Sequence, residues 1–216
     1  MKAIASVSLV VLCAGISGCT TWDQPTRAEA AFETPAAVSQ LPPVSVQSVS
    51  VSVPRTLVVS EANSYLPSGD IVWRGDPLGD RYSQIEAIFS TAAARATDDL
   101  TTGKPVIISI EVQRFHALTE KTRYSVGGIH SMRFLMTVSD AETGVVVRPT
   151  KSVQADIKGY GGEEALAAER AGQTQKVRIT DALTRAINAE LTRPEGYKNE
   201  RLGLIQQLNH RAGSST

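Results

Sequence analysis

The chain has 216 residues, and its 22 lysines and arginines balance its 22 aspartates and glutamates. Without a basic excess, the sequence offers no general electrostatic attraction for nucleic acid or for an anionic membrane surface. Its two cysteines, Cys13 and Cys19, lie near the start of the chain, so the remainder has no thiol for a disulfide, a metal site or a nucleophile.

The first segment of the chain ends at Cys19. Lys2 precedes an apolar stretch over residues 4–16, and the run Ile-Ser-Gly-Cys follows at residues 16–19. A stretch of this length is too short to cross a bilayer core of roughly 30 Å as a helix. The order of charge, apolar stretch, small residues and cysteine resembles a bacterial lipoprotein signal with its lipobox. The alternative is a membrane or core helix that happens to end in Gly-Cys.

The resemblance to a lipoprotein signal has direct consequences for Cys19. It implies that the thiol receives a diacylglyceryl group, that the chain is cut before Cys19, and that a fatty acid such as palmitate acylates the new amine. Two or three acyl chains would hold the protein on a membrane, whereas one gives only marginal attachment. Thr20 rather than Asp follows the cysteine, which the resemblance associates with the outer membrane. We therefore expect a signal peptide over residues 1–18 and a lipid-anchored protein on the periplasmic face of the outer membrane.

A tether and a folded domain follow the anchor. Residues 19–43 are rich in Ala, Thr, Pro and Gln, a composition typical of a disordered tether. A flexible tether of this length would span roughly 25–30 Å on average. We expect an α+β lipoprotein domain over residues 44–194 and a C-terminal tail over residues 195–216.

Valines alternate with serines at the start of the domain. The alternation changes phase at Gln47-Ser48, which would need a bulge to keep the valines on one face. We predict a strand over residues 53–60. The stretch before Pro54 is left open, because proline cannot donate to a ladder and would need an edge or a strand start.

A long helix is predicted next. Asp76-Pro77 indicates its start, since aspartate caps free N–H groups and proline fits the first helical turn. Gly103 and Pro105 indicate its end. An apolar stripe with alternating spacings of four and three runs along one face, formed by Leu78, Tyr82, Ile85, Phe89, Ala92, Ala96 and Leu100.

Three strands and a second helix complete the domain. Apolar and polar residues alternate over 106–113, 132–139 and 152–158, and a tight hairpin turn at residues 140–144 joins the last two. A second helix is predicted over residues 163–192. The order strand, helix, three strands, helix predicts an α+β fold: a two-layer sandwich with a four-stranded, mainly antiparallel sheet and two helices on one face.

The densest polar cluster runs from residue 61 to residue 81. Because Trp, Tyr and Arg often dominate binding interfaces, this cluster is a candidate partner-binding loop through Tyr65, Asp70, Trp73 and Arg74. In the alternative, Trp73 closes the open end of the sandwich while the aspartates cap turns and a helix. We favour the packing alternative and keep the four residues as binding candidates.

Two histidines and a glutamate raise the question of a metal. His116, Glu120 and His130 are ordinary zinc-ligand types, but the region is typical of a hairpin, where same-face residues four apart lie about 13 Å from each other. Only His116 and His130, on facing strands, could meet. We expect no bound metal and no cofactor, and add the three residues to the partner-binding candidates. The sequence also lacks a nucleophile elbow, a dinucleotide fingerprint and a phosphate loop, so we expect no catalytic residues and no enzyme activity.

Two segments carry a family resemblance. Residues 69–77 and 114–124, with Gly127-Gly128 and His130 after them, resemble a family of uncharacterised candidate lipoproteins of proteobacteria. The resemblance covers approximately residues 53–192 and implies a location without an activity. More loosely, the order of elements is similar to that of auxiliary lipoproteins of ABC-type transporters.

These observations favour a non-enzymatic binding or assembly module of the cell envelope. We expect it to contact the membrane through its lipid anchor, and an envelope protein complex or peptidoglycan through its domain, but no nucleic acid. One alternative is an accessory lipoprotein of an ABC-type lipid transport system. The other is a hydrolase or metal-binding protein that uses His116, His130 and Glu120.

Overall fold

A computed structural model describes residues 41–203 of the chain. Cys19, the predicted signal peptide and most of the predicted tether lie outside the described residues. The strands are β1 (Val44–Ser52), β2 (Ile71–Val72), β3 (Lys104–His116), β4 (Gly128–Asp140) and β5 (Val146–Gly159). The helices are α1 (Arg81–Thr97), α2 (Glu120–Arg123), α3 (Gly162–Arg170) and α4 (Gln175–Thr192).

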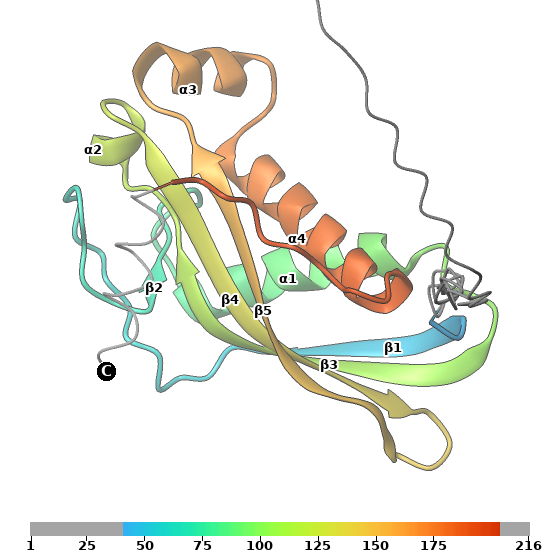
Figure 1. Ribbon diagram of the computed structural model, residues 1–216. Coiled ribbons are helices and arrows are strands. Elements are labelled where there is room, and N and C mark those ends of the chain that lie inside the picture. Colours follow the sequence, from blue (N-terminus) through green and yellow to red (C-terminus); the bar gives the residue numbers. More distant parts are fainter. Residues whose placement is uncertain (1–40, 204–216) are drawn as a thin grey trace, which may run out of the picture. The chain divides into compact units, whose positions relative to one another are not determined.

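One sheet backed by two long helices forms the domain, which confirms the predicted α+β class (Figure 1). The strand order is β1-β3-β4-β5, and β2 also pairs with β3. Pairing is antiparallel from β3 to β5, as predicted, whereas β1 and β2 run parallel to β3. Since β4 occupies the other edge of β3, β1 and β2 follow one another along the same edge. The parallel pairing of β1 is possible because α1 lies between β1 and β3 in the chain as a crossover.

The first strand lies earlier than predicted. β1 covers the stretch that the sequence left open and ends before Pro54, whereas residues 53–60 form turns and one isolated bridge from Val59 to Ile71. The predicted bulge is present as a register shift between Val46 and Ser48. Because the bulge absorbs one residue, the valines on both sides of it pack against the core.

Helix α1 begins at Arg81, four residues later than Pro77. Its N-cap is Asp80, whose carboxylate accepts hydrogen bonds from the backbone N–H groups of Tyr82 and Ser83. Leu78, which we placed on the buried stripe, is 82% exposed. Asp76 does not cap the helix, because its carboxylate is taken up by other side chains described below.

The predicted second helix is two helices. Gly172, at φ 75°, separates α3 from α4, and Thr174 caps α4 by accepting a hydrogen bond from the N–H of Val177. Helix α4 packs beside α1 on the sheet, while α3 lies at one end of it (Figure 1). The two long helices lie in close contact, because the side chains of Thr184 and Asn188 in α4 donate hydrogen bonds to backbone carbonyls of α1. The predicted arrangement of two helices on one face is therefore met by α1 and α4.

The chain after α4 returns along β5. The N–H of Tyr197 donates to the carboxylate of Glu190 over 2.9 Å. Asn199 forms two hydrogen bonds with Asp156 of β5, accepting from its N–H over 2.7 Å and donating to its carboxylate over 3.0 Å. Residues 195–203, which we assigned to the tail, thus contact the domain. None of the helices within residues 41–203 has the length and apolar character needed to cross a membrane.

Candidate functional site

The two segments that the sequence singled out lie together at one end of the sheet. Thr119, in the β3–β4 connection, donates its hydroxyl to the carbonyl of Ser64 over 2.8 Å. Nearby, the N–H of Lys121 donates to the side chain of Asn63 over 2.9 Å. These bonds join the loop before β2 to the β3–β4 connection, although the loops are more than 50 residues apart in sequence.

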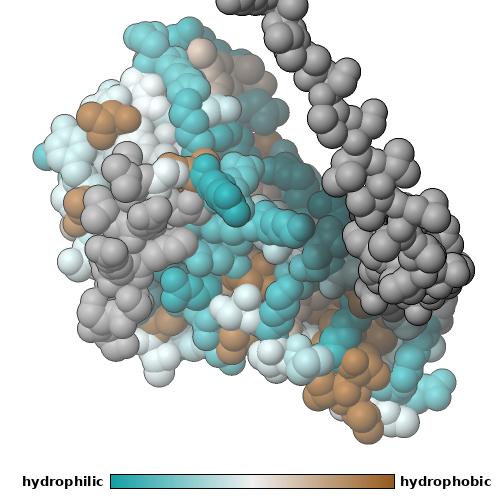
Figure 2. All heavy atoms as spheres, in the orientation of Figure 1, coloured by the Kyte–Doolittle hydropathy of each residue, from teal (hydrophilic) through white to brown (hydrophobic). Residues whose placement is uncertain are grey.

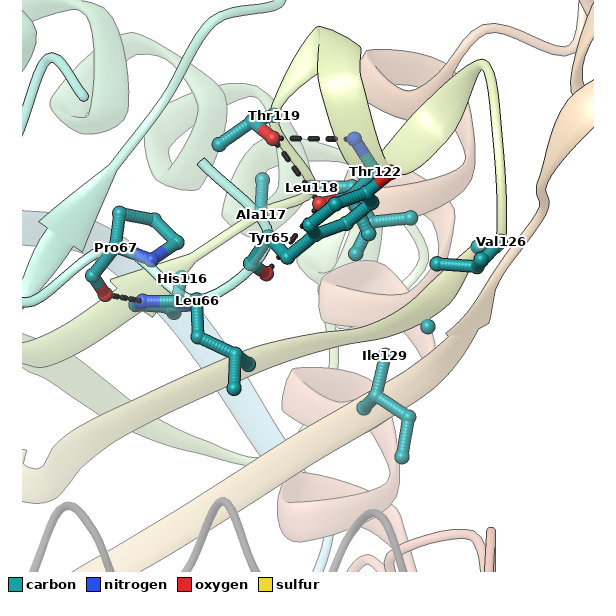
Figure 3. A pocket seen from close by; sticks show the side chains of 12 residues that line it. Tyr65, Leu66, Pro67, His116, Ala117, Leu118, Thr119, Thr122, Val126 and Ile129 are labelled. Atoms are coloured by element: carbon teal, nitrogen blue, oxygen red, sulfur yellow. Dashed lines mark hydrogen bonds between the residues drawn. The ribbon is translucent and has the colours of Figure 1, made fainter. Parts of the chain in front are cut away.

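A cavity of about 370 Å³ opens between the two loops (Figure 3). Residues 65–67 line it from the first loop, and residues 116–119, Thr122 and residues 126–129 line the rest. We call it the loop cavity. Its volume lies in the range of ordinary ligand pockets. Its principal apolar lining comprises Leu66, Pro67, Ala117, Leu118, Val126 and Ile129.

Three polar side chains of the loop cavity, those of His116, Thr119 and Thr122, have hydrogen-bond partners within the protein. The Nε2 atom of His116 lies 3.1 Å from the carbonyl oxygen of Pro67. The hydroxyls of Thr119 and Thr122 lie 3.1 Å apart, and the hydroxyl of Thr122 also donates to the carbonyl of Tyr65 over 3.3 Å. The partners of these side chains are protein atoms. An apolar group could therefore enter the cavity and exclude water without leaving these side chains unpaired.

Exposed apolar side chains surround the opening. Leu66 is 80% exposed and Val126 is 75% exposed. Exposed apolar residues also occur at the tip of the β4–β5 hairpin, where Val145 and Val146 contribute to the hydrophobic surface (Figure 2). Leu66 and Val126 also line the concave, apolar loop cavity, whereas Val145 and Val146 do not line it. This combination marks a binding site better than scattered surface residues do.

Ion pairs hold the first loop against the rest of the domain. Arg74 pairs with Glu120 of α2 and donates to the carbonyl of Glu61 over 2.9 Å. Arg81, which is buried, pairs with Glu61 over 2.7 Å. The hydrogen bond from Arg81 lowers the pKa of Glu61. Burial acts to raise the pKa of Glu120, but the hydrogen bond from Arg74 and the surrounding positive charges lower it overall.

Trp73 belongs to the core and not to the surface. It is fully buried, its Nε1 donates to the carboxylate of Asp76 over 2.9 Å, and its ring packs edge-on against Phe115. Asp76 also pairs with Lys176 of α4, which explains why it does not cap α1. Asp70 has a turn role, because its carboxylate accepts a hydrogen bond from the N–H of Val58. The packing alternative thus describes these residues, and Trp73 is corrected as a binding candidate because no partner can reach it.

The histidines point to opposite faces of the sheet. His116 pairs in register with Ser131, so the adjacent His130 lies on the other face. His130 is buried, and its Nδ1 accepts a hydrogen bond from the N–H of Leu118 over 3.3 Å. Burial lowers the pKa of His130 to about 3 and also lowers the pKa of His116, so both rings are neutral near pH 7.

The suggested set of His116, His130 and Glu120 therefore does not converge. Our expectation that the two histidines could meet was wrong, because the β3–β4 connection contains α2 and the register places His116 opposite Ser131. Glu120 is committed to Arg74. Across residues 41–203, no group of three or more His, Cys, Asp or Glu side chains is placed to hold a metal ion.

Of the predicted binding residues, Tyr65 and His116 line the loop cavity, and Arg74 and Glu120 stabilise the loops beside it. Sequence reasoning missed Leu66 and Val126, which supply the exposed apolar surface. The available signal was an apolar residue within an otherwise polar loop.

Comparisons with known proteins return a family and a set of distantly similar structures. A family model described as a family of unknown function (DUF6778) matches residues 44–207. No curated protein matches the sequence.

Among solved structures, the domain is similar to a candidate lipoprotein from Caulobacter crescentus CB15, with 14% identity, 65% of this chain and 86% of that chain covered, and a TM-score of 0.31. It is also similar to a DUF330-family protein from Xanthomonas campestris, with 11% identity, 68% and 81% covered, and a TM-score of 0.40. A third similarity is to the PelC dodecamer from Paraburkholderia phytofirmans, with 14% identity, 65% and 86% covered, and a TM-score of 0.27. Similarities this distant carry no argument about function, and none of the three descriptions names an ABC-type transporter.

Proposed function

The chain belongs to the DUF6778 family of unknown function, and from this starting point we propose that it is a lipid-anchored, non-enzymatic binding module of the bacterial cell envelope. The loop cavity is the binding site in this proposal, and its ligand is an apolar segment of a partner polypeptide. The observation that carries the proposal is an apolar cavity bordered by exposed Leu66 and Val126, in which the histidine and both threonines of the lining are already hydrogen-bonded within the protein.

The location in this proposal rests on the sequence before the described residues. The Ile-Ser-Gly-Cys run at residues 16–19 supports lipidation of Cys19, and Thr20 supports the periplasmic face of the outer membrane. A lipid anchor and a binding domain on one chain would keep the partner at the membrane surface.

Recognition of a polypeptide segment fits the edge of the loop cavity. Tyr65 is 49% exposed, and the ammonium of Lys121 lies 4.6 Å from the centre of its ring. The exposed apolar residues thus have a charged and aromatic border, as in interfaces where a few apolar contacts are shielded from water by their surroundings. Burial of Leu66 or Val126 by a partner would contribute about 1.5–3 kcal/mol each.

The non-enzymatic part of the proposal draws on the roles of the titratable residues near the loop cavity. His130 is enclosed in the sheet, His116 lies against the carbonyl of Pro67, and Glu120 is paired with Arg74. Each of these groups already has a structural partner.

Photo-crosslinking in intact cells tests the binding role. A photoreactive phenylalanine derivative at Leu66 should crosslink to a specific envelope protein, and Val126→Glu should reduce that product at least several-fold. Leu78 provides a matched control position, because it is as exposed as Leu66 and does not line the loop cavity. Equal crosslinking of the same protein from both positions, or no effect of V126E, would refute the proposed site.

A further inference from the structure

The described chain ends beside the loop cavity. After Asn199, which is hydrogen-bonded to β5, the chain reaches Leu202, which lines a hollow together with residues 126–129. The same four residues also line the loop cavity. The described chain therefore ends at a hollow that shares four lining residues with the loop cavity.

The sequence that continues from this point has an apolar start. Leu204, Ile205 and Leu208 are its large apolar residues, and the remainder up to residue 216 is polar or small. At about 3.3 Å per residue, the five residues after Gly203 can reach roughly 17 Å. This reach is enough to enter the loop cavity from the hollow that Leu202 lines, because the two spaces share residues 126–129. The family model extends to residue 207, so the matched region includes Leu204 and Ile205.

We propose that residues 204–208 occupy the loop cavity and that their apolar side chains pack against Leu66, Val126 and Ile129. The occupant is thus a segment of the same chain, held near the opening by the hydrogen bonds between Asn199 and Asp156. Its local concentration at the cavity is high because the covalent connection is only a few residues long.

Self-occupancy regulates the binding site. A partner segment must displace residues 204–208, so the domain binds only partners that present a better apolar match or a high local concentration. This competition rests on the proposed function, whereas the occupancy itself does not.

Engineered disulfides in the full-length chain test the occupancy. Disulfide formation requires Cα atoms within about 7 Å, so the double variants V126C/I205C and L66C/I205C should form an internal bond that peptide mass spectrometry detects. The control is L78C/I205C, and single-cysteine variants account for any bond to the native thiols at residues 13 and 19. We expect at least one cavity pair to crosslink several-fold above the control. Yields at both cavity pairs equal to the control would overturn the inference.

A second measurement addresses the competition separately. Removal of residues 204–216 should raise photo-crosslinking of the partner from Leu66 at least several-fold, because the internal competitor is gone. An unchanged yield would refute the competition. Since the disulfide test needs no partner, failure to find a partner would affect only the proposed function.

Discussion

His130 is expected to make the free energy of unfolding fall as the pH drops below 7. Its imidazole is buried, and burial, together with the nearby charges of Arg178 and Arg123, lowers the pKa from 6.5 to about 3. The folded chain therefore keeps the ring neutral, whereas the unfolded chain takes up a proton near pH 6.5. Because the folded pKa is the lower one, the stabilisation is present above pH 6.5 and is lost progressively toward pH 3.

The size of the effect follows from the two pKa values. Between pH 7 and pH 5, proton uptake by the unfolded chain removes about 2 kcal/mol of stability through His130 alone. The variant His130→Asn keeps a side-chain acceptor for the N–H of Leu118 and abolishes this titration. Its stability should therefore fall by about 2 kcal/mol less than that of the wild type over the same pH interval.

Urea unfolding of the full chain at pH 7 and pH 5 measures this difference. His116→Asn serves as the control, because burial lowers the pKa of this second histidine as well. Because each variant removes the titration of one histidine, comparison of the two assigns the pH-dependent loss to His130 and His116 separately. If the wild type and His130→Asn lose equal stability between the two pH values, burial does not hold His130 neutral and the reasoning is refuted.

Three further predictions concern the anchor, the core and the returning chain. Cys19→Ser should move the protein from the membrane fraction to the soluble fraction, and retention in the membrane would contradict lipid anchoring. Gly75→Ala should lower the free energy of unfolding by about 1–3 kcal/mol, because the new Cβ would lie 2.3 Å from the Trp73 ring. The control is Gly79→Ala, whose Cβ would lie 3.2 Å from the end of a flexible side chain and which should change the free energy of unfolding by less than about 0.5 kcal/mol. Equal urea midpoints for the two variants would argue against close packing around Trp73. Asn199→Ala removes two hydrogen bonds to β5 and should lower the free energy of unfolding by about 1–3 kcal/mol. It should also reduce the yield of the disulfide in V126C/I205C, and an undiminished yield would show that another contact positions the chain after residue 199.

Patterns within a few residues of one another predicted the fold well. The bulge at Gln47-Ser48 and the hairpin at residues 140–144 both occur as expected, the latter with Asp140 accepting from two turn N–H groups and Gly144 at φ 72°. Period-two alternation located β3, β4 and β5. The boundary errors arose where one residue had two possible uses, as at Asp76, which could cap a helix but instead binds Trp73 and Lys176.

The candidate site was predictable only in part. Sequence reasoning selected the two loops that form it, and Tyr65 and His116 do line the loop cavity. It could not show that Trp73 is buried, since an aromatic residue beside charges is equally typical of a surface loop. It also could not place the histidines, because the face on which each one lies depends on the register of β3 against β4.

The sequence by itself predicts the lipid anchor, and it determined the absence of thiols in the domain and the alternation that builds the sheet, because each depends on neighbouring residues or on composition. The tertiary structure decided where the apolar surface gathers. Ser64 and Thr119 are 55 residues apart and meet through a hydrogen bond, and this bond, with those from Lys121 and Thr122 to the same loop, encloses the space beside Leu66 and Val126. The sheet and the ion pairs around Arg74 set the distance between the two loops, and this distance determines the cavity. No local pattern in either loop encodes it.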